Sequence, residues 1–227
     1  MIISHKHKFI FVKTRKTAGT SFETLLASIC DSSDVITEIS EEKIRLEKYG
    51  LRFQNTTIHF KYYTLKDWLR LIFKFKKKKF HSHMPAHEIQ KYVSTYVWNN
   101  YFKFCLERNP WDKTISHFFW RGGYDKYNSI EGYLNSRDFE RTSNFKLYSE
   151  DGKIIIDKIY QLESIDECIE ELSEKFRCEF NYTFSDIKFK TNQRKDKRNY
   201  KDVLNPNSAD RIARLHEKEI TLLNYKY

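Results

Sequence analysis

A six-residue run that begins at Lys16, Lys-Thr-Ala-Gly-Thr-Ser, has the composition of a loop that binds a phosphate or another oxyanion. Lys16 carries a full positive charge, and the hydroxyls of Thr17, Thr20 and Ser21 can donate hydrogen bonds to several oxygens at once. Gly19 has no side chain, so the backbone can come close to a ligand. The run therefore predicts an anion site.

The segments on either side predict a strand before this loop and a helix after it. Residues 9–12 are aromatic or branched, as in a short buried strand, and Phe22, Leu25, Leu26 and Ile29 recur at helical spacing. The first N–H groups of a helix lack intrahelical partners and lie at its positive end, so such a junction attracts an anion. The lysine precedes the glycine, which differs from the common nucleotide-binding loop.

A second strand-to-helix junction follows about 90 residues later. Residues 102–107 form another apolar run, and Arg108 comes directly after it. Asn109 and Pro110 suit the N-cap and first position of a helix. Ser116 lies seven residues after Asn109, about two turns on, so it shares the face that starts the helix. Arginine suits bidentate contact with phosphate oxygens, and two anion sites imply a doubly phosphorylated ligand.

The two segments, KTAGTS and RNPWDKTIS, resemble the phosphate-binding signatures of sulfotransferases that use 3′-phosphoadenosine 5′-phosphosulfate (PAPS). The resemblance is closest to the carbohydrate-type sulfotransferases, although Arg15 stands where they usually have proline and Ala18 where they usually have the first glycine. It implies an α/β fold of the P-loop-like sulfotransferase type, with a central parallel sheet flanked by helices.

The same resemblance implies which residues bind and react. It predicts transfer of a sulfuryl group from PAPS to an acceptor hydroxyl, which leaves 3′-phosphoadenosine 5′-phosphate (PAP), without a metal. Lys16 would neutralise charge on the departing phosphate, and Arg108 and Ser116 would hold the 3′-phosphate. The basic segment 191–200 would close over the nucleotide through Arg194, although a solvated charge run is the slightly favoured interpretation of this segment. The predicted nucleotide-binding residues are Lys16, Thr17, Ala18, Gly19, Thr20, Ser21, Arg108, Ser116 and Arg194.

Transfer to a hydroxyl requires a proton acceptor, and a cluster of three histidines lies between the two signatures. His81, His83 and His87 are candidates, because histidine titrates near neutral pH. The segment HMPAHEI resembles the histidine-led stretch that carries the base in the carbohydrate-type enzymes, so we expect His83 to be the base. A metal site at His83 and His87 is disfavoured because Pro85 lies between them.

The remaining pattern predicts one α/β domain over residues 1–227, with residues 50–100 as an insertion that faces the acceptor. Strand-like runs occur at 8–13, 102–107 and 154–162, separated by helical patterns. Predicted helical features are a stripe of Ile89, Tyr92, Val93 and Tyr96, a capping box of Ser164 with Glu167 before a stripe at Ile165, Cys168, Ile169, Leu172 and Phe176, and one last helix after Pro206.

Residues 65–80 interleave aromatic and aliphatic residues with lysine and arginine. This basic amphipathic pattern fits three possibilities: peripheral contact with a membrane surface, contact with an acidic polysaccharide, or ordinary packing of one helix face. The 41 Lys and Arg against 31 Asp and Glu give a net charge of +10, which suits an anionic cofactor. We expect a saccharide acceptor and no nucleic-acid partner.

The first residues contain too short an apolar run for a secretory signal, so we expect a cytoplasmic protein, or one from which an upstream anchor was removed. The four cysteines show no metal-ligand spacing, and we expect Cys105 and Cys168 to be core residues rather than parts of a disulfide framework. Two other function classes stay open: a nucleotide-dependent phosphotransferase, and a basic polysaccharide or nucleic-acid binding module without catalysis.

Overall fold

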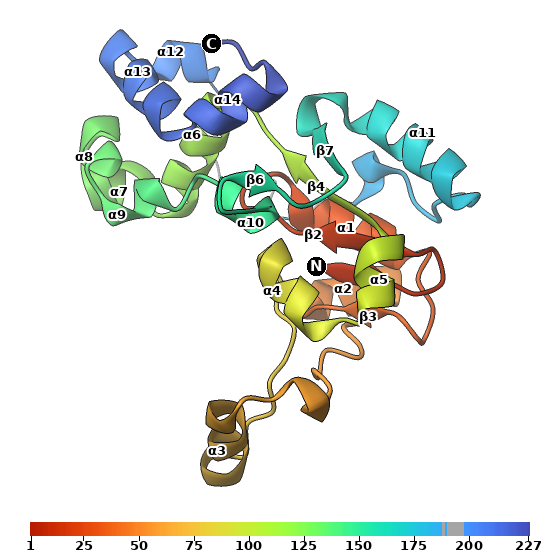
Figure 1. Cartoon of the computed structure of the whole chain (residues 1–227). Coiled ribbons are helices and arrows are strands. Elements are labelled where there is room, and N and C mark those ends of the chain that lie inside the picture. The colour runs from red at the N-terminus through yellow and green to blue at the C-terminus, as the bar shows by residue number, and fades with distance from the viewer. Residues whose placement is uncertain (188, 190–197) are drawn as a thin grey trace.

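The computed structural model describes residues 1–187, 189 and 198–227. A mixed five-stranded sheet lies at its centre, with strand order β3-β1-β2-β4-β7 (Figure 1). Its strands are β1 (Ile2–Ser4), β2 (Phe9–Val12), β3 (Val35–Ile36), β4 (Phe102–Glu107) and β7 (Lys158–Gln161). A separate hairpin is formed by β5 (Ser149–Glu150) and β6 (Lys153–Ile154).

The sheet is parallel on one side and antiparallel on the other. β2, β4 and β7 run parallel, whereas β1 pairs antiparallel with β2 and with β3. Only residues 5–8 join β1 to β2, too few for the crossover that parallel strands need. The expectation of a parallel sheet is therefore wrong for this edge, while the α/β class with flanking helices is confirmed.

The first two predicted strands are confirmed as β2 and β4, and the third is corrected. The predicted run 154–162 divides, because Ile154 belongs to the β5–β6 hairpin and the chain enters the central sheet only at Lys158. Asp157 marks the change: its N–H donates to the Lys103 carbonyl at 2.8 Å, and its carboxylate accepts from the Lys103 N–H at 2.7 Å.

The helices of the described residues run from α1 to α14, with three short 3₁₀ turns between them. The longer helices and those near the site are α1 (Gly19–Ala27), α2 (Glu42–Tyr49), α3 (Leu65–Lys74), α4 (Ala86–Tyr92), α5 (Thr95–Asn100), α6 (Pro110–Trp120) and α11 (Ile165–Phe176). The others are α7 (Gly123–Tyr127), α8 (Ile130–Leu134), α9 (Arg137–Glu140), α10 (Phe145–Tyr148), α12 (Tyr200–Val203), α13 (Pro206–Leu215), α14 (Glu217–Leu223) and the turns η1 (Phe60–Tyr62), η2 (Leu162–Ser164) and η3 (Phe184–Asp186).

The two faces of the sheet carry separate apolar cores. Side chains alternate along β2, so Phe9 and Phe11 pack on one face and Ile10 and Val12 on the other. The first face is covered by α1 and α11, and the second by α4, α5 and α10. The predicted apolar stripes of α1 and α11 are confirmed as core.

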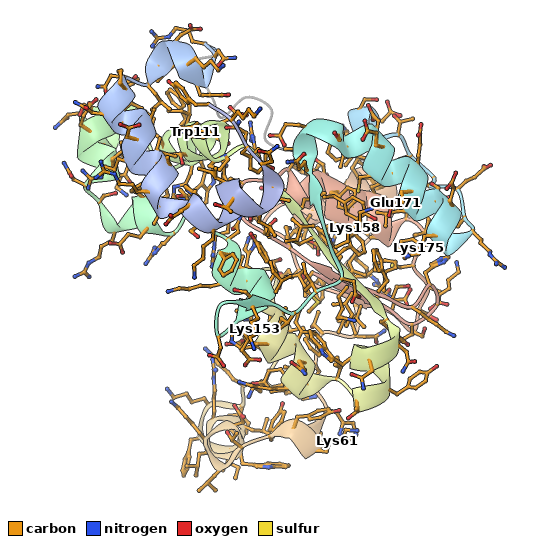
Figure 2. The ribbon with its side chains drawn as sticks, turned by 45° about the horizontal axis from the view of Figure 1, so that its top comes forward. Lys61, Trp111, Lys153, Lys158, Glu171 and Lys175 are labelled. Atoms are coloured by element: carbon orange, nitrogen blue, oxygen red, sulfur yellow. The ribbon has the colours of Figure 1, made fainter. Side chains whose placement is uncertain are left out.

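The cover formed by α11 reaches the edge strand β7 through polar contacts as well. Lys158 of β7 and Glu171 of α11 form an ion pair, and Lys175 Nζ lies 4.2 Å from the ring centroid of Phe102 (Figure 2).

All four cysteines are free thiols, and Cys105 and Cys168 are buried as expected.

A third core lies outside the sheet, among α6, α8 and α13. Trp111, Ile115 and Phe118 of α6 pack there against Tyr133 of α8 and Ile212 of α13. The indole N–H of Trp111 donates to the Ala209 carbonyl at 2.9 Å. This small helical cluster fixes α6, which carries the second predicted anion site.

Three helix predictions are wrong in detail. The stripe through Tyr96 is broken, because α4 ends at Tyr92 and α5 begins anew, leaving Tyr96 60% exposed. Ser164 makes no side-chain cap, since it ends the turn η2 with φ −114° and ψ 44° rather than with extended backbone. The helix after Pro206 divides at His216 into α13 and α14.

Among the described residues, no helix has the length and apolar character that crossing a membrane requires.

Candidate anion-binding site

The two predicted junctions lie side by side at the carboxyl edge of β2 and β4. The strands are parallel and in register, with Val12 opposite Cys105, so the loop after β2 meets the residues after β4. The Thr14 hydroxyl donates to the Leu106 carbonyl and joins the two strand ends directly. The carboxyl edge of parallel strands is where α/β proteins place their ligands.

The first loop turns through two left-handed residues before α1. Lys16 has φ 60° and Ala18 has φ 54°, a conformation that costs a residue with a Cβ atom free energy. Ala18 is the N-cap of α1, and no side chain caps the helix. The strand–loop–helix arrangement is confirmed, and the first N–H groups of α1 stay available for an anion.

The Thr17 hydroxyl does not face the site. Thr17 is fully buried, and its Oγ1 lies 2.8 Å from Oγ1 of Thr14 and 3.4 Å from the Thr14 carbonyl oxygen. This hydroxyl therefore holds the loop together. The predicted donors that line the site are those of Thr20 and Ser21.

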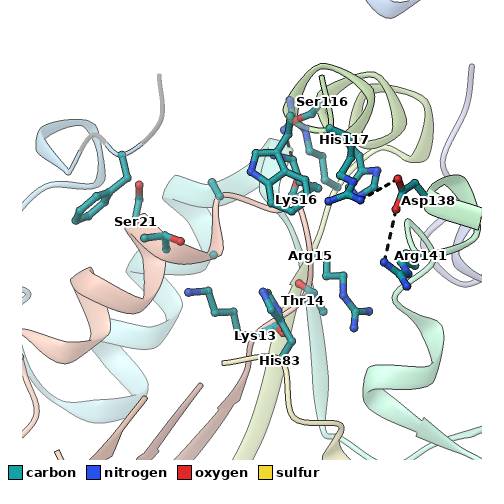
Figure 3. A pocket seen from close by; sticks show the side chains of 17 residues that line it. Lys13, Thr14, Arg15, Lys16, Ser21, His83, Ser116, His117, Asp138 and Arg141 are labelled. Atoms are coloured by element: carbon teal, nitrogen blue, oxygen red, sulfur yellow. Dashed lines mark hydrogen bonds and ion pairs between the residues drawn. The ribbon is translucent and has the colours of Figure 1, made fainter. Parts of the chain in front are cut away.

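A cavity of about 510 Å³ opens between the two junctions (Figure 3). This volume falls within the range of about 300–1,000 Å³ that is usual for small-molecule sites. Among the described lining residues, six are Lys or Arg and one is acidic; the full set is Lys13, Thr14, Arg15, Lys16, Ala18, Gly19, Thr20, Ser21, His83, Arg108, Ser116, His117, Trp120, Arg121, Asp138, Arg141 and Phe189.

The structure brings Lys16, Arg108 and Ser116 to this one cavity, although 92 residues separate the first two. Asn109 caps α6 by accepting from the N–H groups of Trp111 and Asp112, as predicted. Arg108 donates through Nε to Asp112 at 2.9 Å and through Nη1 to the Lys16 carbonyl at 3.3 Å. These contacts tie the second junction to the first loop. Arg194 lies outside the described residues.

Carboxylates and rings orient the other cations of the cavity. Lys13 forms a 2.6 Å ion pair with the buried Glu23 of α1. Lys16 Nζ lies 5.3 Å from the ring centroid of Trp120. Gly19 permits this arrangement, because a Cβ atom there would meet the Lys13 side chain at 3.1 Å.

His83 is the histidine of the predicted cluster that reaches the cavity. Of His81, His83 and His87, all of which are described, only His83 lines it. Its Nδ1 lies 3.0 Å from the Lys13 carbonyl oxygen, which can only accept, so Nδ1 carries the proton and Nε2 is left as an acceptor. Burial lowers the pKa of His83 to about 4, so the ring is neutral at pH 7.

A second histidine, His117, lines the cavity and was not predicted. Its Nδ1 lies 2.7 Å from the Tyr133 hydroxyl, and burial, with a smaller effect of Lys16, lowers its pKa to about 4. The signal that could have found it is its position on α6, directly after Ser116 and one turn before Trp120 and Arg121.

The far side of the cavity is also unpredicted, and it is built around Asp138. This carboxylate accepts from Arg121 at 2.9 Å, from Lys126 at 2.9 Å and from the Tyr127 hydroxyl at 2.6 Å, and Arg141 lies 3.5 Å away. The Tyr127 hydrogen bond, followed by the two cations, holds the pKa of Asp138 well below its usual range. The carboxylate therefore positions Arg121 and Arg141 at the cavity wall.

A buried polar network supports the loop from below. Glu107, at the end of β4, forms a 2.9 Å ion pair with Lys113 of α6, and both side chains are fully buried. Asn144 donates to Glu107 at 3.3 Å, and its amide accepts from the N–H of Arg15 and donates to the Arg15 carbonyl. Asn144 thereby fixes the loop backbone just before Lys16.

Fold and site together define an α/β protein with a cationic cavity at the carboxyl edge of its central sheet. No protein-family model and no solved structure matches the chain. The chain is 32% identical over 97 residues to a protein of Archaeoglobus fulgidus, described as uncharacterized, and the match covers 40% of this chain and 81% of the relative. The chain belongs to the same family as that archaeal protein, whose description names no activity.

No group of three or more His, Cys, Asp and Glu residues that could hold a metal ion occurs in the part of the chain that the structure describes.

Proposed function

We propose that the protein is a PAPS-dependent sulfotransferase of the P-loop-like sulfotransferase fold, which acts on a hydroxyl of a saccharide. The observation that carries the proposal is the convergence of Lys16, Arg108 and Ser116, from two separate signature segments, on one cationic cavity. The loop at Lys16 and the side chain of Arg108 line the same site. A ligand that carries phosphates at two positions requires two such groups of donors.

The lining residues fit the parts of this nucleotide. Thr20, Ser21 and the first N–H groups of α1 offer donors to the 5′-phosphosulfate, beside the charge of Lys16. Arg108 and Ser116 offer a fork and a hydroxyl to the 3′-phosphate. The rings of Trp120 and Phe189 line the same cavity and offer flat faces to an adenine.

When bound, PAPS supplies a sulfuryl group, whose sulfur forms a bond to the acceptor oxygen while its bond to the 5′-phosphate oxygen breaks. Lys16 stabilises the negative charge that develops on that phosphate oxygen. His83 accepts the hydroxyl proton on Nε2, since its Nδ1–H is held by the Lys13 carbonyl. Ion pairs fix Lys13 and Arg108 before the ligand arrives, which reduces the cost of ordering them.

Ligand choice tests the proposal. Thermal unfolding is measured with PAP, with AMP, which lacks the 3′-phosphate, and with ATP in the presence and absence of magnesium. A ligand at 100 times its dissociation constant stabilises the folded state by about 2.7 kcal/mol, so a large shift with PAP and a small one with AMP is expected. Stabilisation by ATP with magnesium but not by PAP would favour the phosphotransferase instead.

Two variants make the test specific to the cavity. Arg108→Ala should remove most of the PAP shift. Lys153→Ala is the matched control, because Lys153 is an exposed cation on β6 that does not line the cavity (Figure 2). An equal loss in both variants would indicate binding through net charge alone, as in a polyanion-binding module.

A further inference from the structure

Residues 59–80, here called the arm, project from the body of the molecule and carry α3 at the far end (Figure 1). Backbone hydrogen bonds close its base: the N–H of Ile58 donates to the Lys78 carbonyl at 3.0 Å, and the N–H of Phe80 donates to the Thr56 carbonyl at 2.8 Å. The chain therefore leaves and re-enters the body of the molecule at the same place, through the paired segments 56–58 and 78–80.

The arm has its own internal structure. Thr64 and Asp67 form a complete capping box at the start of α3, and Asp67 also pairs with Lys78 at 2.8 Å. The ring of Trp68 packs on Phe60 and Tyr63, with centroids 5.7 and 5.5 Å away. These contacts hold the helix in a defined place relative to the base of the arm.

Most of the other apolar side chains of α3 are exposed. None of the ten residues of the helix is buried. Leu65 is 78% exposed, Ile72 61%, Phe73 75% and Phe75, which follows the helix, 89%. Several large apolar side chains exposed on one short segment mark an interaction surface, whereas single exposed apolar residues scattered over a protein are ordinary.

Cations are interleaved with these apolar residues along the arm. Residues 61–79 contain eight Lys or Arg and one acidic residue, Asp67, whose carboxylate is engaged by Thr64 and Lys78. A surface that combines exposed apolar side chains with many cations complements the interface of an anionic lipid bilayer, where apolar side chains enter the acyl region and lysines meet the headgroups.

We propose that the arm binds the protein peripherally to an anionic membrane surface, with the side chains of Leu65, Ile72, Phe73 and Phe75 inserted below the headgroups. A second copy of the chain would bring the same positive charge against itself. An acidic polysaccharide would use the lysines but would leave the aliphatic side chains in water. This proposal does not depend on the proposed function, because no residue of the arm lines the cavity.

Vesicle binding by the full chain tests this inference. Co-sedimentation is measured with vesicles of phosphatidylcholine alone and with vesicles of equal parts phosphatidylcholine and phosphatidylglycerol. Binding to the mixed vesicles that weakens with added salt, and at least tenfold weaker binding to phosphatidylcholine alone, is expected. Equal binding to both, or to neither, would overturn the proposal.

Two double variants test whether vesicle binding uses the arm or another part of the surface. Ile72→Ser with Phe73→Ser should weaken binding to the mixed vesicles at least tenfold, without loss of helical circular dichroism from the body. Ile44→Ser with Leu46→Ser is the matched control, since these side chains of α2 are 45% and 49% exposed and lie outside the arm. Equal effects of the two pairs would overturn the assignment to the arm.

Binding to heparin, a polyanion, distinguishes attraction by charge alone from insertion of apolar side chains. Heparin binding by the Ile72→Ser, Phe73→Ser variant should remain close to that of the unchanged protein, because its lysines are intact. If vesicle binding also remained unchanged in this variant, the arm would be a polyanion-binding surface and the membrane proposal would fail. Self-association through the arm, seen by light scattering and lost in the variant, would also overturn it.

Discussion

The cavity and the arm are both strongly cationic, yet they hold their charges in opposite ways. In the cavity, carboxylates orient the cations: Glu23 holds Lys13, Asp112 holds Arg108 and Asp138 holds Arg121. Around α3, the acidic residue of the arm engages Lys78, and apolar side chains rather than carboxylates lie among the other cations.

This difference separates two kinds of anion recognition. Cations that are fixed before binding suit a small ligand whose oxygens have defined positions, because little side-chain freedom is lost on binding. Cations on exposed flexible stems beside apolar side chains suit a wide surface, to which attraction is diffuse and screened by salt over about 8–10 Å. Variants in one region should therefore leave binding by the other region intact.

The largest effect that would sharpen this contrast is expected from His83→Ala. Removal of a general base costs about 10²- to 10⁴-fold in turnover, with PAP affinity little changed, and vesicle binding should be unaffected. Turnover is measured with PAPS and a saccharide acceptor. His81→Ala is the control, since His81 is exposed and does not line the cavity. Equal losses in both variants would reassign the base.

The pH profile tests the same residue without a mutation. Burial depresses the pKa of His83 from 6.5 to about 4, so Nε2 is free to accept a proton at any pH above that value. The ratio kcat/KM, which reports the free enzyme, should stay level as the pH is lowered through 6.5 and fall only as it approaches about 4. A fall centred near 6.5 would show that an ordinary exposed histidine is the base.

Lys16→Ala should produce the next largest effect. A donor aimed at charge that develops in the transition state is worth about 10²- to 10³-fold in kcat, so turnover should fall by that amount while PAP still binds detectably. Binding of anionic vesicles should not change. Unchanged turnover in this variant, with Lys153→Ala as the control, would contradict the proposed chemistry.

Arg108→Ala should have a smaller effect that depends on the ligand. Hydrogen bonds to charged groups contribute about 1.5–3 kcal/mol, so PAP affinity should fall by about 10- to 150-fold and AMP affinity much less. Calorimetric titration with both nucleotides measures the difference. Arg108→Lys keeps the charge but loses the fork that Asp112 holds, and should recover only part of the affinity. Parallel losses for PAP and AMP would show that Arg108 contacts another part of the ligand.

The parts of the fold that the sequence predicted are those encoded by contiguous residues. The junctions at Gly19 and Asn109 were predictable because strand, loop, cap and helix follow one another directly. β1 has three residues and β3 two, too few to show a period, so the antiparallel edge of the sheet could not be read. The capping box formed at Thr64 rather than at Ser164, because the turn η2 runs straight into α11.

The residues of the candidate site also fall into a group that local sequence predicted and a group that it did not. Lys16, Arg108 and Ser116 were predicted from local signatures, whereas Asp138 and Arg141 reach the cavity from α9 and the residue after it, far along the chain. Their placement depends on the third core, which packs α8 against α6 and α13. No local pattern around residues 138–141 indicates that packing.

The smallest predicted effect concerns the loop backbone, which must be rigid if the cavity is fixed before binding. Ala18 has φ 54°, where a Cβ atom costs about 1–2 kcal/mol, and glycine removes that cost but adds about 0.4–1 kcal/mol of unfolded-state entropy. Ala18→Gly should therefore raise the free energy of unfolding, measured in urea, by roughly 0.5–1 kcal/mol.

Ala27→Gly, in the last turn of the same helix, is the matched control and should lower the free energy of unfolding by about 1 kcal/mol, because its backbone is helical and its methyl group is buried. Both variants lose one methyl group, so opposite signs would isolate the backbone strain at position 18. If Ala18→Gly were as destabilising as the control, the loop would not hold the left-handed turn on which the first anion site depends. In that case PAP affinity should also be unaffected by Gly19→Ala, since a loop free to rearrange could accommodate a Cβ atom beside Lys13.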